Sequence, residues 1–255
     1  MSTRIKTRLW DERPDPRSPF AGQSVRLAGF DYYGDLLGQA GWADTVWLLF
    51  TGEAPTREQR TLFEHLAVAL ANPGPRDPSV HAAMSSGIGG SPAAASLMAA
   101  LAVAAGDHGG SGELVRAMHA WQAASDDPAG LSAALAAHAI DGDTWPGFAA
   151  HLHHTPPTVH KCLNALCRAP LSVRLNRLQA AAPALSAQCQ RGLSLIGVAA
   201  AAFADLGLSP TQAEALHLLL RLPGALAHAL EQSTQSYRDF PFFALTEAAP
   251  EPAHG

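Results

Sequence analysis

The part of the chain that most constrains its fold is the stretch from Leu97 to Met118, in which two helical runs of small residues meet at a glycine-rich turn. Helices rich in alanine let neighbouring backbones approach closely, so we expect this turn deep in a helical core. Its glycines permit positive φ angles and leave the main chain open to a ligand. His108 lies in the turn, and Glu113 opens the next helix, where an anionic ligand is favoured. The turn is therefore the first candidate for a functional site.

Helical periodicity continues along most of the chain. Apolar residues recur every three to four positions, whereas alternating β-branched runs are nearly absent, so no strand is expected. Prolines at 183 and 223 predict breaks between helices. The expected helices start near residue 31 and at residue 56, and then cover 81–84, 92–105, 113–124, 131–139, 157–168, 172–181, 183–187, 192–206, 210–220 and 227–236. This pattern predicts an all-α fold.

The chain is long enough for more than one compact part. Residues 1–30 form an expected N-terminal arm, because three prolines exclude a long helix there. We expect a large helical domain over 31–140 and 191–241, and a smaller helical subdomain over 141–190. Residues 242–255 are expected to be a tail.

Composition excludes several classes of protein. A net charge of −5 argues against a nucleic-acid partner, which would require a basic face. No apolar run reaches the roughly 18 residues of a membrane span, and the charged N-terminus lacks the apolar core of a secretory signal. The three cysteines are an odd number without metal-ligand spacing, which favours free thiols in a reducing compartment. We therefore expect a cytoplasmic protein with no membrane partner.

Five segments carry a further signal. They read VRLAGFD followed by LLG at 25–38, FTGEAPT at 50–56, GDHGGSGE at 106–113, WPGF at 145–148 and LPGALAHALE at 222–231. Together they resemble motifs of the citrate synthase superfamily, in particular its short citryl-CoA lyase-like branch, and they keep the order of that family. The resemblance covers nearly the whole chain.

The resemblance implies a helical homodimer with a large and a small domain. Such proteins join an acyl-CoA to a 2-oxo acid, or cleave the adduct, without a permanently bound cofactor or metal. A histidine donates a hydrogen bond to the thioester oxygen, where negative charge develops. This position corresponds to His108, with Gly109 and Gly110 beside it in the substrate-binding turn. Arg238, which precedes Asp239, either reaches a substrate carboxylate across the dimer or is a solvated surface charge.

Four positions depart from the family pattern. The upstream substrate-binding histidine corresponds to Pro73, and the arginine of an Asp-Pro-Arg motif corresponds to Pro157. The histidine that polarises the keto group corresponds to Ala150, and the aspartate that removes a proton corresponds to Ile196. A hydrocarbon side chain can do neither task, and loss of such a group typically costs about 10²–10⁴ in rate. His151, one position after the lost histidine, is a candidate substitute.

Several interpretations therefore stay open. The chain is either an enzyme with an altered substrate or weak activity, or a non-catalytic ligand-binding or partner subunit on the same scaffold. In an enzyme, Asp107, Asp205 or a neighbouring histidine would have to supply the base. The histidine-rich segment 151–160 is either an exposed loop or, as a third interpretation, a metal site.

Overall fold

The computed structural model describes residues 4–127 and 129–241, apart from the side chain of Pro19. The described chain divides into two compact units. Unit 1 contains residues up to Ala71 and residues 105–220, and unit 2 contains residues 72–104 and those from Arg221 onward. The long helix α10 (Pro210–Ser233) contributes residues to both units.

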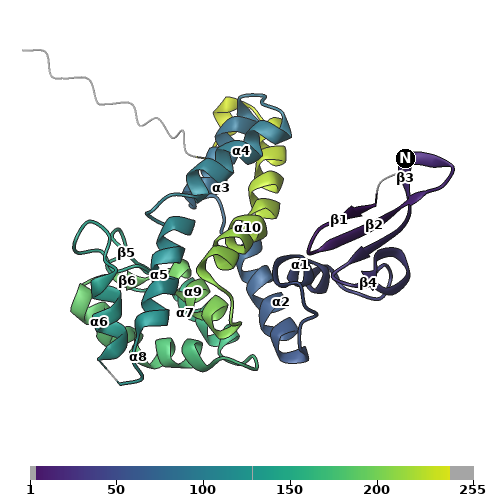
Figure 1. The fold of residues 1–255 in the computed structure, drawn as a ribbon. Helices are drawn as coiled ribbons and strands as arrows, with labels where there is room; N and C mark the ends of the chain where they lie inside the picture. The colour runs from purple at the N-terminus through teal and green to yellow at the C-terminus, as the bar shows by residue number, and fades with distance from the viewer. Residues whose placement is uncertain (1–3, 128, 242–255) are drawn as a thin grey trace, which may run out of the picture. The chain divides into compact units, whose positions relative to one another are not determined.

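The helices of unit 1 surround a single apolar core (Figure 1). They are α1 (Trp42–Thr51), α2 (Arg57–Ala71), α5 (Ser111–Ala123), α6 (Gly130–Ala137), α7 (Pro157–Leu166), α8 (Val173–Cys189) and α9 (Leu195–Asp205). Helix α9 is the most deeply buried, and residues 198–203 are fully enclosed. Helices α2, α5, α7 and α8 all contact α9, because its run of alanines presents little side-chain bulk. The predicted helical fold is confirmed in this unit.

Unit 2 is smaller and is built from α3 (Pro78–Ile88), α4 (Ala93–Ala104), the second half of α10 and the 3₁₀ helix Tyr237–Asp239. Close backbone packing joins α3 to α10. A Cβ placed on Gly87 would lie 2.2 Å from the carbonyl oxygen of Ala229, so only glycine fits at this crossing. Phe240 belongs to the small core, and its ring centroid lies 5.8 Å from that of His81 with the two rings tilted by 31°.

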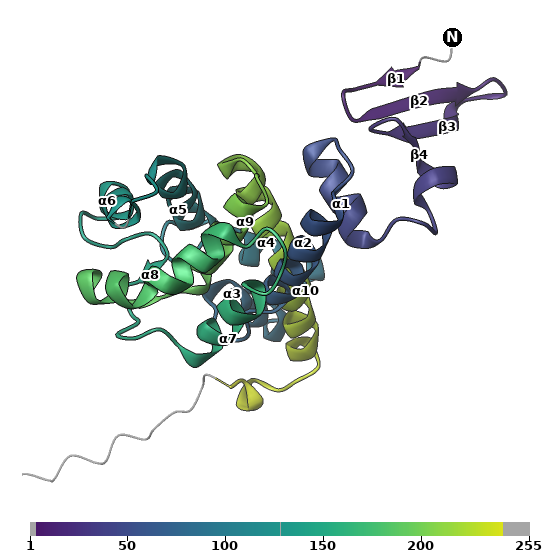
Figure 2. The same ribbon diagram turned by 90° about the horizontal axis from the view of Figure 1, so that it is seen from below.

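The N-terminal segment corrects one prediction. Instead of an arm without strands, it forms an antiparallel sheet of β1 (Ile5–Lys6), β2 (Trp10–Asp15), β3 (Ser18–Leu27) and β4 (Phe30–Asp31), followed by the π-helix Tyr32–Leu36 (Figure 2). The sequence pattern did not predict these strands because they carry charged residues rather than alternating apolar ones. Arg4, just before β1, pairs with Asp11 of β2, and within β2 the Trp10 indole donates to Glu12. Pro14 lies where the β2–β3 register shifts, and a bulge tolerates a residue without an amide donor.

The expected breaks at two prolines are also corrected. Helix α8 continues through Pro183 and α10 continues through Pro223. Both proline residues are exposed, so water can replace the amide hydrogen bond that each ring removes. Pro183 and Pro223 therefore predicted helix ends that the structure does not have.

The division into units differs from the predicted domains. Residues 141–190 lie within unit 1, where Leu163 and Leu178 belong to the same apolar core as α9. The smaller unit instead joins 72–104 to the C-terminal part of the described chain. The predicted tail at 242–255 lies outside the described residues. No helix of the described chain combines the length and apolar character that crossing a bilayer requires.

Candidate functional site

The glycine-rich turn before α5 carries His108 on an exposed loop rather than deep in a core. Gly109 has φ +70°, which favours glycine, and Gly110 is the N-cap residue of α5 without a side-chain hydrogen bond to cap the helix. The turn ends as the chain enters the helix, where Ser111 is fully buried. His108 therefore projects from the start of a rigid helix while its imidazole stays accessible.

An acidic partner contacts the ring. The Nε2 atom of His108 lies 3.1 Å from Oδ2 of Asp141, and the two side chains are 61 % and 75 % exposed. Asp141 has φ +51° and precedes Gly142 at φ +84°, in a narrow loop closed by hydrogen bonds between Ile140 and Thr144. The Asp-Gly pair is typical of a turn. Nothing in the sequence indicated that this turn reaches His108, because 33 residues separate the two side chains.

The second acidic group, Glu113, is buried and joins two segments that are distant in sequence. Its Oε2 accepts a hydrogen bond from the Gly109 amide at 2.6 Å, and its Oε1 accepts one from the Gly147 amide at 2.8 Å. Burial raises the pKa of Glu113, although these two hydrogen bonds and the charges of His108 and His151 act to lower it. Both histidines therefore lie close enough to influence the Glu113 carboxyl group, and the predicted substitute His151 belongs to this neighbourhood.

A third segment meets the other two at Gly147. The Gly147 carbonyl oxygen accepts hydrogen bonds from the Ser194 amide at 2.8 Å and from the Ser194 hydroxyl at 3.0 Å. A Cβ on Gly147, which has φ +90°, would lie only 2.7 Å from Cα of Gly197. The short strands β5 (Phe148–Ala149) and β6 (Gly192–Leu193) pair beside this contact. The segments around His108, Gly147 and Ile196 therefore converge, although they are far apart in the sequence.

Ile196 lies in the first turn of α9 and is 5 % exposed. It belongs to the apolar core of unit 1. Ala150 is exposed, and its carbonyl oxygen accepts a hydrogen bond from Arg191. Pro157 is the first residue of α7, where a missing amide donor costs nothing. The side chains of these three residues offer no proton donor or acceptor.

Two predicted residues belong to unit 2. Pro73 lies in the connection between α2 and α3 and is half-buried. Arg238 lies in the 3₁₀ helix with an exposed side chain. Its expected contact with a substrate carboxylate stays a prediction.

The two aspartates considered as alternative bases have other partners. Asp107 is exposed and faces Arg116 at 3.8 Å. Asp205 accepts hydrogen bonds from the amides of Arg174 and Leu175 and so caps the start of α8. It ends α9, about 14 Å along the helix from Ile196 by the usual rise per residue.

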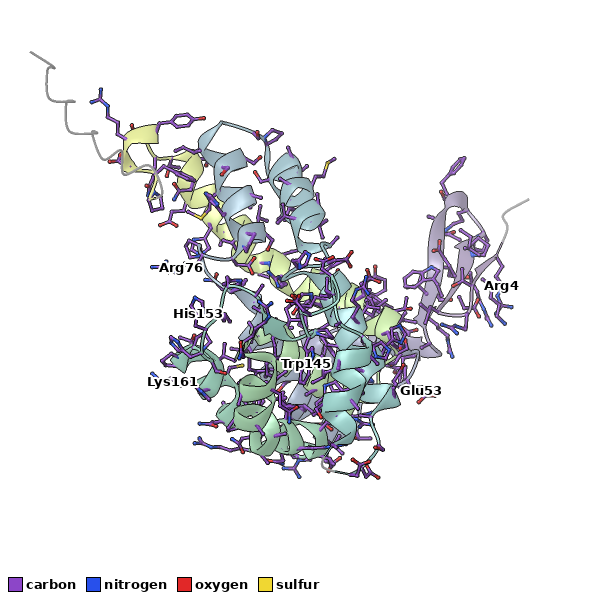
Figure 3. All side chains as sticks on the ribbon, turned by 90° about the vertical axis from the view of Figure 1, so that its left-hand side faces the viewer. Arg4, Glu53, Arg76, Trp145, His153 and Lys161 are labelled. Carbon is purple, nitrogen blue, oxygen red and sulfur yellow. The ribbon has the colours of Figure 1, made fainter. Side chains whose placement is uncertain are left out.

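The histidine-rich segment is exposed at His153, His154 and His160. In Figure 3, His153 and Lys161 lie at the edge of unit 1, whereas Trp145 lies among its helices. Within the described residues, no three His, Cys, Asp or Glu side chains gather as metal ligands would. The three cysteines are free thiols.

Comparison with known proteins shows which of them share this fold. Neither a family model nor a curated protein matches the chain. Among solved structures, citryl-CoA lyase from Hydrogenobacter thermophilus is 19 % identical with a TM-score of 0.68, and the match covers 98 % of this chain and 96 % of that chain. The chain therefore has the citrate synthase-like fold of citryl-CoA lyase, as its motifs predicted.

Two ATP citrate lyase structures also match. The enzyme from Methanothrix soehngenii, in complex with citrate and coenzyme A, is 19 % identical with a TM-score of 0.67; 89 % of this chain and 41 % of that chain are covered. A mutant of the Methanosaeta concilii enzyme, in complex with (3S)-citryl-CoA, is 19 % identical with a TM-score of 0.68; the match covers 84 % of this chain and 37 % of that chain. The chain thus spans well under half of these two larger proteins.

Proposed function

We propose that this chain binds an acyl-CoA thioester, together with a 2-oxo acid or as their adduct, at the site around His108. The observation that carries this proposal is the bridge made by Glu113. Its carboxylate links the His108 turn to Gly147, which in turn contacts the start of α9. Two of the motif segments, 106–113 and 145–148, therefore meet the start of α9 at one site. Two proteins of the same fold hold coenzyme A or citryl-CoA, which supports the same class of ligand.

The substituted positions argue for changed or slow chemistry. With isoleucine at 196 and alanine at 150, the site lacks the proton acceptor and the keto-polarising group that the resemblance implies. The lost groups would act on the same transition state, so their effects do not add independently. Citryl-CoA cleavage at the ordinary rate of such enzymes is therefore not expected.

Binding is the first test of the proposed function. Acetyl-CoA and citryl-CoA are expected to raise the midpoint of thermal unfolding and to give saturable heats in titration calorimetry, because a ligand that binds only the folded state stabilises it. Citryl-CoA cleavage is expected to be about 10²–10⁴ slower than in an enzyme that retains the base. Absence of binding by acetyl-CoA, citryl-CoA and free coenzyme A would contradict the proposal.

A non-catalytic role on the same scaffold is the second candidate. It is favoured by the burial of Ile196 in the apolar core, which leaves no carboxylate at the start of α9. Such a protein would bind the thioester and return it unchanged. Citryl-CoA turnover at an ordinary rate would exclude this role.

We also propose a homodimer, as the resemblance implies. Large apolar side chains are exposed on the segments where contact with a second copy is expected, at 31–50 and 91–124. They are Tyr33, Leu37, Trp42, Leu49, Met98 and Val103. Exposed large apolar side chains are common at protein interfaces.

Light scattering at micromolar concentration is expected to give twice the 26.6 kDa of one chain. The variant Trp42→Glu places a charge at a residue that is 75 % exposed and should shift the equilibrium towards monomer. Val173→Glu, at an equally exposed residue of α8, is the matched control and should leave the dimer intact. A monomeric wild type would contradict the dimer.

A further inference from the structure

We infer that His108 removes the proton from the carbon next to the thioester and that Asp141 positions its ring for this task. This inference rests on the proposed binding of an acyl-CoA. It reverses the role that the resemblance implies for His108, namely donation of a hydrogen bond to the thioester oxygen. It also supplies the proton acceptor that Ile196 cannot provide.

The contact with Asp141 decides which ring nitrogen carries the proton. An ionised carboxylate only accepts hydrogen bonds, so Nε2, at 3.1 Å from Oδ2, must be the donor. In the neutral ring, Nδ1 then holds a lone pair and can only accept. Neutral His108 is therefore unsuited to donate to a thioester oxygen through Nδ1, but it is suited to accept a proton there.

The conformation of the loop that carries Asp141 fixes the position of its carboxylate beside His108. Asp141 occupies the left-handed region at φ +51°, which aspartate adopts more readily than most residues, and the Ile140–Thr144 hydrogen bonds hold both ends of the loop. Other charged groups belong to the same part of the chain. Glu113 accepts a hydrogen bond from the Gly109 amide, Asp107 and Arg116 form an ion pair, and the charge of His151 acts on Glu113.

The step is balanced without any further reactant. The C–H bond next to the thioester breaks, its proton moves to Nδ1 of His108, and its electron pair forms the C=C bond of an enolate. The carbonyl π electrons move to the thioester oxygen. The positive end of the α5 helix dipole, at the N-cap residue Gly110, favours negative charge on an oxygen bound at this turn.

Hydrogen exchange of acetyl-CoA in D₂O tests the inference directly. With and without a 2-oxo acid such as oxaloacetate, the wild type is expected to exchange the methyl hydrogens at a rate that rises with pH, as catalysis by a general base requires. His108→Ala should lose about 10²–10⁴ of this rate. His108→Gln should lose as much, because an amide retains a hydrogen-bond donor but cannot accept the proton.

Variants of the loop 140–144 distinguish the positioning of His108 by Asp141 from a general effect of changing this loop. Asp141→Asn should reduce the exchange rate about 10-fold to 100-fold, as expected when a carboxylate that orients a histidine is lost. Asp143→Asn is the matched control, because its carboxylate lies two residues away and pairs with Arg191 instead. That variant should exchange within about twofold of wild type, since it removes a surface charge only.

Each outcome decides between the alternatives. An exchange rate that falls with rising pH, or survives in His108→Gln, would show that the ring acts as a donor and would overturn the inference. Nitrogen-15 NMR of the free protein should show the Nε2–H tautomer of His108, and the Nδ1–H tautomer would overturn it too. Binding of acetyl-CoA without exchange would refute the base while leaving the proposed function standing. Absence of binding would remove both.

Discussion

Replacing Gly147 by alanine is expected to lower the free energy of unfolding by about 2–5 kcal/mol. Two effects combine at this residue. Its φ of +90° is strained for any residue with a Cβ, and the added methyl group would lie 2.7 Å from Cα of Gly197. The Gly197 backbone cannot move away easily, because α9 is enclosed by the core. The loss should appear in denaturant unfolding, as a lower midpoint with an unchanged slope.

Gly207→Ala is the matched control for this prediction. Gly207 has φ +76°, but nothing lies within 4 Å of the Cβ position, so this variant reports backbone strain alone. We expect a cost of about 1 kcal/mol there. Equal losses in the two variants would show that the contact between Gly147 and Gly197 contributes nothing. Such a result would also weaken the proposed function, because this contact joins the start of α9 to the site.

The fold was largely predictable because its two strongest signals are local. Apolar residues at helical spacing mark one face of each helix, and glycine or proline marks many of the ends. The N-terminal sheet was not predicted because its strands carry charged side chains, such as Asp11, which pairs with Arg4, instead of alternating apolar residues. Its pairing depends on which segments meet, and composition does not record that. For the same reason, residues 141–190 gave no sign that they share the core of α9.

At the candidate site, too, the sequence did not show which distant residues contact one another. His108 and its glycines could be chosen from a contiguous motif, and structural comparison supports the fold to which that motif belongs. Asp141 could not be chosen, because an Asp-Gly pair predicts a turn wherever it occurs. Glu113 was placed at a helix start, yet its buried hydrogen bond to Gly147 depends on a loop 34 residues away. Sequence motifs identified the segments of the site. The contacts that the Asp141 and Glu113 carboxylates make with these segments could be found only in the three-dimensional structure.

The second large effect is expected in unit 2, where Arg221→Met should cost about 3–5 kcal/mol. The Arg221 side chain is 5 % exposed, pairs with Asp77 and donates to the Ser79 hydroxyl at 3.1 Å. Asp77 is also the N-cap residue of α3 and accepts a hydrogen bond from the Ser79 amide. Removing the guanidinium group leaves this carboxylate largely buried without its opposite charge. Arg17→Met, which breaks a pair with Asp15 in which the arginine side chain is 91 % exposed, is the control and should cost less than about 1 kcal/mol.

The pH dependence distinguishes loss of the ion pair from loss of packing. Burial alone would raise the pKa of Asp77, but the Arg221 charge and the hydrogen bonds from Ser79 and Arg221 outweigh it, so the pKa is lowered. A lowered pKa stabilises the folded state above the ordinary carboxyl pKa, and this stabilisation is lost as the pH falls through the lowered value. The deficit of Arg221→Met should therefore be largest near neutral pH and shrink below about pH 4. In the double variant Asp77→Asn/Arg221→Met, the cost should be well below the sum of the single costs, because neither charge is then left alone. A deficit that is constant with pH, together with additive costs, would assign the effect to the lost arginine stem rather than to its charge.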